Sequence, residues 1–136
     1  MPFVLDASAA GAWLLEEQRH PEVLAMLDSM VSDHAVAPVL WWFEMRNLLL
    51  MRERRGHIEP ATVEQLLHDL AALDIVMDDA REEVLALALA RRHQLTFYDA
   101  AYLELAVRLG LPLVSLDRQL ISAAEIEGVE VIGTQP

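Results

Sequence analysis

Short apolar runs alternate along this chain with longer segments in which apolar residues recur at helical spacing. The short runs predict buried strands at residues 3–5, 35–37, 75–77, 113–116 and 129–132. The longer segments predict helices at residues 9–14, 21–27, 39–55, 60–73, 80–93, 99–109 and from 117 onward. Strands that alternate with helices in this way are typical of a parallel sheet with helices on both faces.

Proline and glycine mark several of the predicted helix ends. Pro21 and Pro60 suit the first turn of a helix, where a backbone N–H has no partner within the helix. Gly56 and Gly110 follow the last apolar positions of two helices and are typical C-terminal stops. Asp99 stands where we expect the N-cap of the helix that ends before Gly110.

The composition indicates a folded chain without a membrane segment. Of 136 residues, 54% are hydrophobic, and the mean hydropathy of +0.27 is far above that of disordered chains. No repeat, low-complexity tract or linker interrupts the pattern, so we expect one domain over residues 1–136. The longest apolar stretch, residues 35–43, contains Pro38 and is too short to span a bilayer. The start MPFVLD lacks the basic region of a signal peptide, and the expected location is the cytoplasm.

Charge and missing residue types exclude several classes of function. The chain carries 22 Asp and Glu against 10 Arg and no Lys, and its net charge of −12 argues against a basic nucleic-acid coat or a polybasic membrane anchor. Because cysteine is absent, disulfides, thiolate catalysis and Cys-based metal sites are excluded. Because lysine is absent, chemistry that requires a lysine amine is excluded as well.

Four acidic residues stand at positions that favour a shared site. Asp6 ends the first predicted strand, Asp117 ends the fourth, and Asp99 opens a late helix. Each Asp, taken singly, is also a common helix N-cap. Glu44 lies in the apolar segment VLWWFEMRNLLLM, where a carboxylate must be paired, protonated or bound to a cation. A salt bridge to a nearby Arg, or orientation by Asn47 one helical turn on, are the structural alternatives for Glu44.

The four acids together point to a divalent cation. In parallel sheets, ligands collect at the carboxyl ends of the strands, so these side chains are expected to converge at one sheet edge. Their mutual repulsion would be unfavourable without a positive charge. Mg²⁺ or Mn²⁺ prefers oxygen ligands and retains water, which leaves room for a phosphate oxygen. The sequence therefore predicts a Mg²⁺ or Mn²⁺ site at this edge of the sheet.

Four strings of the chain, VLDASAA, FEMRNLL, YDAAYLELA and LVSLDRQL, occur in the order and at the spacing of one known family. On these motifs, which cover essentially the whole chain, the sequence resembles PIN-domain ribonucleases, in particular the VapC-type toxins of bacterial toxin–antitoxin pairs. The resemblance implies a three-layer α/β/α sandwich around a five-stranded parallel sheet. It also implies an endoribonuclease that leaves a 3′-hydroxyl and a 5′-phosphate, a homodimer and an antitoxin partner that often reaches the acids with an Arg.

The resemblance carries over to individual residues. It implies that Asp6, Glu44, Asp99 and Asp117 form a catalytic acidic quartet, in which the three Asp residues hold the metal. A second ion, or Glu44 acting through water, would stabilise the charge that develops on the leaving oxygen. Ser8 and Ser115 match small polar positions beside the first and last acids, although a turn or cap hydroxyl is the favoured explanation for each. Asn47 matches the Asn that follows the helix Glu, and these three are the supporting residues.

Two other functions remain alternatives. An aspartyl-phosphotransfer domain also clusters acids at strand ends, but it normally uses a lysine, and the phosphatase variant needs a second Asp where this chain has Ser8. A catalytically weak interaction module is the second alternative, because the predicted helix 39–55 is apolar almost all round. Trp41, Trp42 and Met45 are candidates for a homodimer or antitoxin contact, and the competing explanation is a central, fully buried helix.

Arginine is the only cation available to hold RNA. The planar guanidinium pairs with phosphate oxygens through two hydrogen bonds at once. Arg46 and Arg52 lie on the helix that carries Glu44, and Arg118 follows Asp117. These three arginines are the predicted phosphate contacts.

Overall fold

The computed structural model describes residues 2–17, 20–31 and 33–133. It contains five short strands and seven α-helices in these residues. The strands are β1 Phe3–Leu5, β2 Ala35–Pro38, β3 Ile75–Asp78, β4 Leu113–Ser115 and β5 Val131–Gly133. The helices are α1 Ala7–Leu14, α2 Pro21–Asp28, α3 Leu40–Arg54, α4 Pro60–Ala71, α5 Glu83–His93, α6 Phe97–Leu109 and α7 Arg118–Ile126, with a 3-10 turn, η1, at Ser29–Val31.

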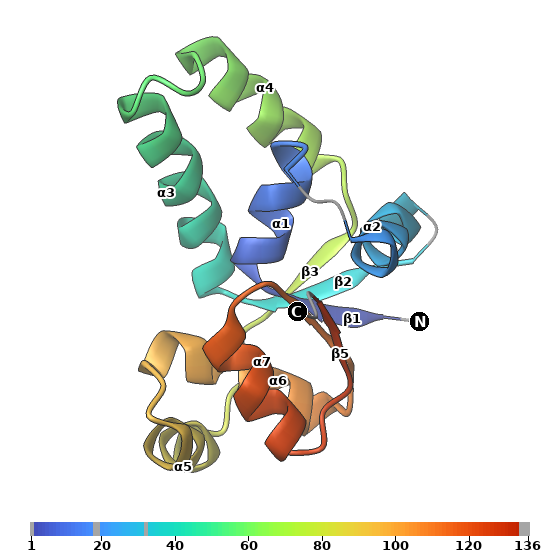
Figure 1. The fold of residues 1–136 in the computed structure, drawn as a ribbon, viewed down its shortest axis with the longest axis vertical. Helices are drawn as coiled ribbons and strands as arrows, with labels where there is room; N and C mark the ends of the chain where they lie inside the picture. Colours follow the sequence, from blue (N-terminus) through green and yellow to red (C-terminus); the bar gives the residue numbers. More distant parts are fainter. Residues whose placement is uncertain (1, 18–19, 32, 134–136) are drawn as a thin grey trace.

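The five strands form one parallel sheet in the order β3-β2-β1-β4-β5. Helices α1 to α4 lie on one side of the sheet and α5 to α7 on the other (Figure 1). This arrangement confirms the α/β/α sandwich with a central five-stranded parallel sheet. Because the order along the sheet makes β1 and β4 neighbours, the residues that follow these two strands lie at the same edge.

The core explains why the strands appear in the sequence as uninterrupted apolar runs. All three residues of β1 and of β4 are buried, as expected for strands covered by helices on both faces. Helix α6 is central on its side of the sheet and contacts both β1 and β2. Its buried positions include Leu103 and Leu105, which no single helical stripe would bury together.

Helix boundaries differ from the prediction by up to three residues, and at the starts of α6 and α5 hydrogen bonds give the reason. Helix α6 begins at Phe97, and its N-cap is Thr96, whose hydroxyl accepts a hydrogen bond from the Asp99 N–H at 3.1 Å. The prediction of Asp99 as the cap is therefore wrong, and its side chain lies in the first turn instead. Helix α5 begins at Glu83, three residues later than predicted, because side chains of α6 hold the preceding connection in a non-helical path.

Helix α3 turns two of its predicted contact residues into the core. Trp41 is 2% exposed and Met45 is fully buried, so the prediction that they contact a partner is wrong. Trp42 is 46% exposed and remains available at the surface. Among the described residues, no helix is both long enough and apolar enough to cross a membrane.

Candidate active site

Asp6 is a buried carboxylate held by two serine hydroxyls. It directly follows β1 and is 6% exposed. Ser8 Oγ donates to Asp6 Oδ2 at 2.6 Å, and Ser115 Oγ donates to the same oxygen at 2.7 Å. Burial raises the pKa of Asp6 above its usual range and the nearby Asp117 adds to the rise, while the two hydroxyls oppose it. The sequence prediction placed Ser8 and Ser115 beside the acids, and the structure shows both bonded to Asp6.

The same serines join the ends of β1 and β4. Ser8 Oγ accepts a hydrogen bond from the Leu116 N–H at 3.1 Å, and Ser115 Oγ accepts one from the Asp117 N–H at 3.0 Å. Asp117 is the N-cap of α7, where its Oδ1 accepts from the Leu120 N–H at 3.1 Å. The capping role predicted for Asp117 is thus present, and it fixes this carboxylate at the edge of the sheet where Asp6 lies.

Glu44 comes from the second turn of α3 and is paired with a residue of α6. The Tyr102 hydroxyl donates a hydrogen bond to Glu44 Oε1 at 2.5 Å. Burial raises the pKa of Glu44, the tyrosine bond opposes that rise, and Asp6 and Asp99 add to it. Burial beside Glu44 also raises the pKa of Tyr102 well above its normal range, so this phenol stays protonated as a donor.

Neither of the two structural alternatives for Glu44 is observed. Within the described part of the chain, Asn47 makes no hydrogen bond to Glu44, and no Arg forms an ion pair with it. Sequence reasoning missed Tyr102, although a signal was present. Tyr102 follows Asp99 by three residues, so a helix that turns Asp99 toward the acids turns Tyr102 to the same side.

Asp99 faces the other acids from the first turn of α6. Burial is the largest cause that raises the pKa of Asp99, and the charges of Asp117 and Asp6 raise it further. The hydrogen bond at Thr96 opposes the rise. Asp99 therefore shares an electrostatic environment with the two acids that follow β1 and β4.

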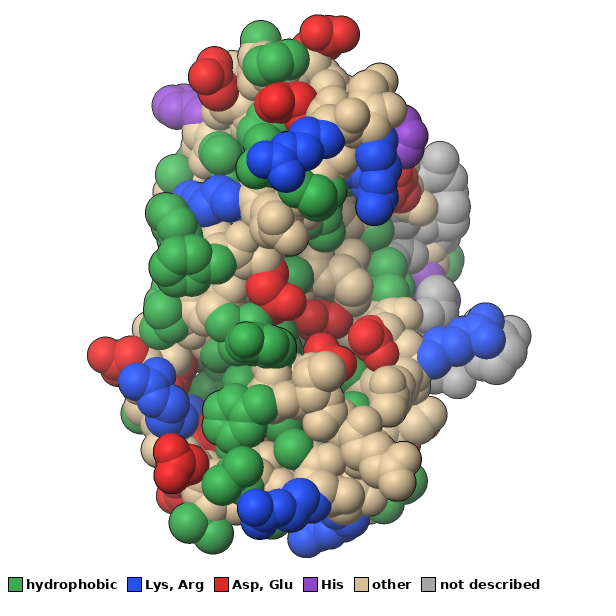
Figure 2. All heavy atoms as spheres, turned by 90° about the vertical axis from the view of Figure 1, so that its left-hand side faces the viewer, with side chains coloured by type: hydrophobic (Ala, Val, Ile, Leu, Met, Phe, Trp, Pro, Cys, Tyr) green, Lys and Arg blue, Asp and Glu red, His purple; other side chains and the backbone are tan. Residues whose placement is uncertain are grey.

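The four acids converge from four separate elements. Asp6 follows β1, Glu44 belongs to α3, Asp99 to α6 and Asp117 caps α7. On the face shown in Figure 2, acidic side chains gather at the middle, between the halves of the molecule. Each of the three acids with a raised pKa owes part of the rise to another member of the group. The site concentrates negative charge that neither an Arg nor a His in the described residues neutralises.

The chemistry of this donor set fits a hard divalent cation. All four groups offer carboxylate oxygens, the ligands that Mg²⁺ and Mn²⁺ prefer, and a cation would relieve the repulsion among them. Over the described ranges, no three acidic or histidine side chains are arranged as ligands of a single ion.

The three predicted phosphate-binding arginines lie in different environments. The Arg46 guanidinium lies 3.8 Å from the Trp42 ring centroid and donates to the Trp42 carbonyl at 3.1 Å. Arg52 donates two hydrogen bonds to Glu17, at 2.5 and 3.0 Å. Arg118 is exposed at the first position of α7, next to Asp117, and no ion pair engages it among the described residues. Of the three, Arg118 is the one left open beside the acids.

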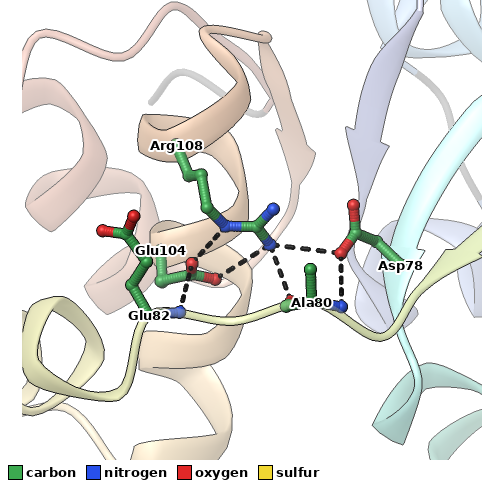
Figure 3. A network of polar contacts seen from close by, with 5 residues as sticks. All are labelled: Asp78, Ala80, Glu82, Glu104 and Arg108. Atoms are coloured by element: carbon green, nitrogen blue, oxygen red, sulfur yellow. Dashed lines mark hydrogen bonds and ion pairs between the residues drawn. The ribbon is translucent and has the colours of Figure 1, made fainter.

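A second polar network, which the sequence did not predict, fixes the connection between β3 and α5 (Figure 3). Arg108 donates through Nε to Glu104 Oε1 at 2.5 Å and through Nη2 to Asp78 Oδ1 at 3.2 Å. Arg108 Nη2 also donates to the Ala80 carbonyl at 2.8 Å, and the Glu82 N–H donates to Glu104 Oε1 at 3.1 Å. Glu104, 3% exposed, thereby anchors residues 79–82 to α6.

Comparisons with known proteins agree with this fold. A family model described as the PIN domain matches residues 3–126. The chain is 35% identical over 126 residues to a protein of Pyrobaculum aerophilum named Ribonuclease VapC3, covering 88% of this chain and 92% of the relative. It is 32% identical over 124 residues to Exonuclease VapC9 of the same organism, covering 88% and 84%. The crystal structure of PAE2754 from Pyrobaculum aerophilum superposes with a TM-score of 0.71 at 27% identity, covering 96% of this chain and 83% of that one.

Proposed function

Because this chain belongs to the PIN-domain family, we propose that it is the toxin of a toxin–antitoxin pair and cleaves RNA as a metal-dependent endoribonuclease. The convergence of Asp6, Glu44, Asp99 and Asp117 at the carboxyl edge of the sheet is the observation that carries the proposal. Two similar proteins bear the names Ribonuclease VapC3 and Exonuclease VapC9, which supports a nuclease activity.

Asp6, Asp99 and Asp117 are the residues that would hold Mg²⁺ or Mn²⁺. The ion, when bound, lowers the pKa of water and offsets the negative charge of the phosphate. The contribution of the chain is to fix the ligands. Ser8 and Ser115 hold the Asp6 carboxylate, and the N-terminus of α7 holds that of Asp117.

Glu44 is placed to handle a proton. Its raised pKa means that the carboxyl keeps a proton at a higher pH than an exposed Glu would. Since Tyr102 donates to Oε1, the proton of a neutral Glu44 would sit on Oε2. We propose that Glu44 gives this proton to the leaving 3′-oxygen of the RNA, which forms a 3′-hydroxyl as the P–O bond breaks.

The acidic surface is compatible with RNA because bound cations offset the charge of the site itself. Arg118, exposed beside Asp117, is the proposed phosphate contact. Arg46 and Arg52 would have to leave Trp42 and Glu17, respectively, to take the same role. Binding of RNA should therefore depend more on Arg118 than on either of these two arginines.

The proposed protein partners are an antitoxin and a second copy of the chain. Trp42 is 46% exposed, and its ring packs edge-on against the Phe43 ring, with centroids 5.0 Å apart. Exposed aromatic groups of this kind are enriched at protein interfaces. An antitoxin Arg directed at the four acids would neutralise them in place of a metal ion and so block the site.

A circular single-stranded RNA tests the proposed activity, because only an endonuclease can open it. Wild-type protein with Mg²⁺ should linearise the circle, and chelation of the metal should stop the reaction. Asp6→Asn and Asp99→Asn should each cleave the circle at least about 100-fold more slowly, because each variant loses a metal ligand. Glu64→Gln, an exposed carboxylate of α4, serves as the matched control and should retain full activity.

Three outcomes would count against this function. Cleavage by Asp6→Asn at the wild-type rate would show that the four acids are not the catalytic centre. Degradation of linear but not circular RNA would show an exonuclease. A well-folded protein that cleaves neither RNA but binds a partner through Trp42 would favour the interaction module, for which the exposed Trp42 and Phe43 rings are the supporting observation.

A further inference from the structure

A pocket of about 280 Å³ lies at the carboxyl ends of β2 and β3, beside α6. One wall is the beginning of α6, with Phe97, Tyr98 and Ala101, and the opposite wall includes Val39 just before α3. The same two helices carry Asp99 and Glu44. Figure 2 shows apolar side chains that border the acidic group on this face. The pocket and the proposed active site are thus built on the same two helices, and none of the four acids lines the pocket itself.

The aromatic side chains of this pocket are unusually accessible. Tyr98 is 67% exposed and Phe97 is 46% exposed. Tyr98 directly precedes Asp99 in the first turn of α6, so its ring stands one residue from a proposed metal ligand. Exposed rings beside a phosphodiester-cleaving site are the groups on which bases of single-stranded nucleic acid stack.

Two arginines, Arg81 and Arg108, and two carboxylates, Asp78 and Glu104, line the pocket. Arg108 lines the pocket, but Glu104 and Asp78 neutralise its guanidinium (Figure 3). Arg81 also lines the pocket, is exposed, and has no ion-pair partner among the described residues. The Arg108 network holds the connection that carries Arg81 through the Ala80 carbonyl. The pocket therefore combines an apolar wall with one exposed arginine, Arg81, that no ion pair engages within the described part of the chain.

We propose that this pocket binds the base of a nucleotide that flanks the scissile phosphate in single-stranded RNA, with the base stacked on Tyr98 and Arg81 near the adjoining backbone phosphate. The inference rests on the proposed nuclease function and specifies how the substrate is held. A paired base cannot enter the pocket, because its faces are covered by neighbouring base pairs. The enzyme should therefore prefer unpaired segments over duplex RNA.

The test pairs a change in the protein with a change in the RNA. After the cut has been mapped in a linear oligonucleotide, abasic sites replace the nucleotides on either side of it, one at a time. For wild-type protein, one of these abasic substrates should lose about 10-fold in kcat/KM, the size expected when a stacked base is removed. On intact RNA, the kcat/KM of Tyr98→Ala should fall by a similar factor, mainly through a higher KM. The abasic site should not lower the kcat/KM of Tyr98→Ala any further. Tyr98→Phe should keep near wild-type kinetics, because stacking needs the ring and not the hydroxyl.

Direct binding gives a second readout that does not depend on catalysis. The Asp6→Asn protein is mixed with the same RNA carrying 2-aminopurine at the flanking position. The fluorescence of the 2-aminopurine should be quenched when the RNA binds. The quenching should disappear when Tyr98→Ala is added to Asp6→Asn. Ile126→Ala, which removes an exposed apolar side chain at the end of α7, is the control and should change neither readout.

Two results would overturn the inference, and a third would separate it from the proposed nuclease function. Equal kcat/KM on intact and abasic RNA would show that no flanking base is bound, and this arm needs no variant to fold. If Tyr98→Ala leaves RNA kinetics intact but changes the molar mass in light scattering, a second copy of the chain covers the pocket. If wild-type protein cleaves no RNA yet quenches 2-aminopurine through Tyr98, the base pocket stands and the proposed nuclease function falls.

Discussion

Replacing Glu104 by Ala should destabilise the protein substantially, although the residue lies outside the group of four acids. Glu104 is 3% exposed and accepts hydrogen bonds from Arg108 and from the Glu82 N–H. Removing one member of a buried ion pair typically costs about 3–5 kcal/mol, because the other charge is left without its partner. Here Arg108 keeps Asp78 and the Ala80 carbonyl, which places the expected loss near the lower end, at about 3 kcal/mol.

For a chain of this size, about 3 kcal/mol corresponds to a fall in Tm of roughly 10 °C. Urea denaturation followed by circular dichroism measures the free energy of unfolding directly. Glu104→Gln, which keeps an acceptor for the Glu82 N–H but loses the charge, should fall between wild type and Glu104→Ala. Glu64→Ala, at an exposed position of α4, should stay within about 0.5 kcal/mol of wild type. A loss below about 1 kcal/mol in Glu104→Ala would refute the anchoring role assigned to Glu104.

Three further predictions concern the acids and the exposed surface. Asp99→Asn should raise the Tm of the metal-free protein by a few degrees at neutral pH, even after losing a favourable helix N-terminal charge worth about 0.3–1 kcal/mol. Because the pKa of Asp99 is raised in the folded state, its ionised carboxylate destabilises the fold at pH values above that pKa. The gain in Tm from Asp99→Asn should therefore vanish at pH values below 3.8, the ordinary pKa of Asp. A lower Tm of Asp99→Asn at neutral pH would contradict this reasoning. Tyr102→Phe removes a hydrogen bond that lowers the pKa of Glu44, so the alkaline limb of the pH profile of kcat should move to higher pH. The lost hydrogen bond should also lower the free energy of unfolding by about 1–2 kcal/mol. An alkaline limb that does not move would argue against Glu44 as the proton donor. Trp42→Ala should weaken self-association or antitoxin binding at least 10-fold while changing stability by less than about 1 kcal/mol, as measured by light scattering and calorimetry; unchanged association would remove Trp42 from the interface.

The pattern of apolar residues was sufficient for the architecture because each element buries its own side chains in a regular way. Strands β1 and β4 are covered on both faces, so every position is apolar and the runs stand out from the sequence. Gly56 and Gly110 adopt positive φ angles of 76° and 66°, which confirms them as helix stops. These features depend on residues that are close together in the chain.

The same local reasoning failed where two nearby residues compete for one role. Thr96 and Asp99 are both good N-cap residues, three positions apart, and only the path of the chain into α6 shows that Thr96 takes the cap. Helix α3 is apolar almost all round, so the sequence did not reveal which of Trp41 and Trp42 enters the core. Packing against the sheet buries Trp41 and leaves Trp42 exposed.

The sequence by itself determined the fold class, the four acidic positions and the two serines beside them, because strand ends in a parallel sheet share one edge. Only the tertiary structure decided how these groups are held. The partner of Glu44 is Tyr102, 58 residues away, and the anchor of residues 79–82 is the Glu104–Arg108 pair of α6. Hydrogen bonds between distant segments leave no periodic trace in the sequence, because they depend on how whole elements pack against one another.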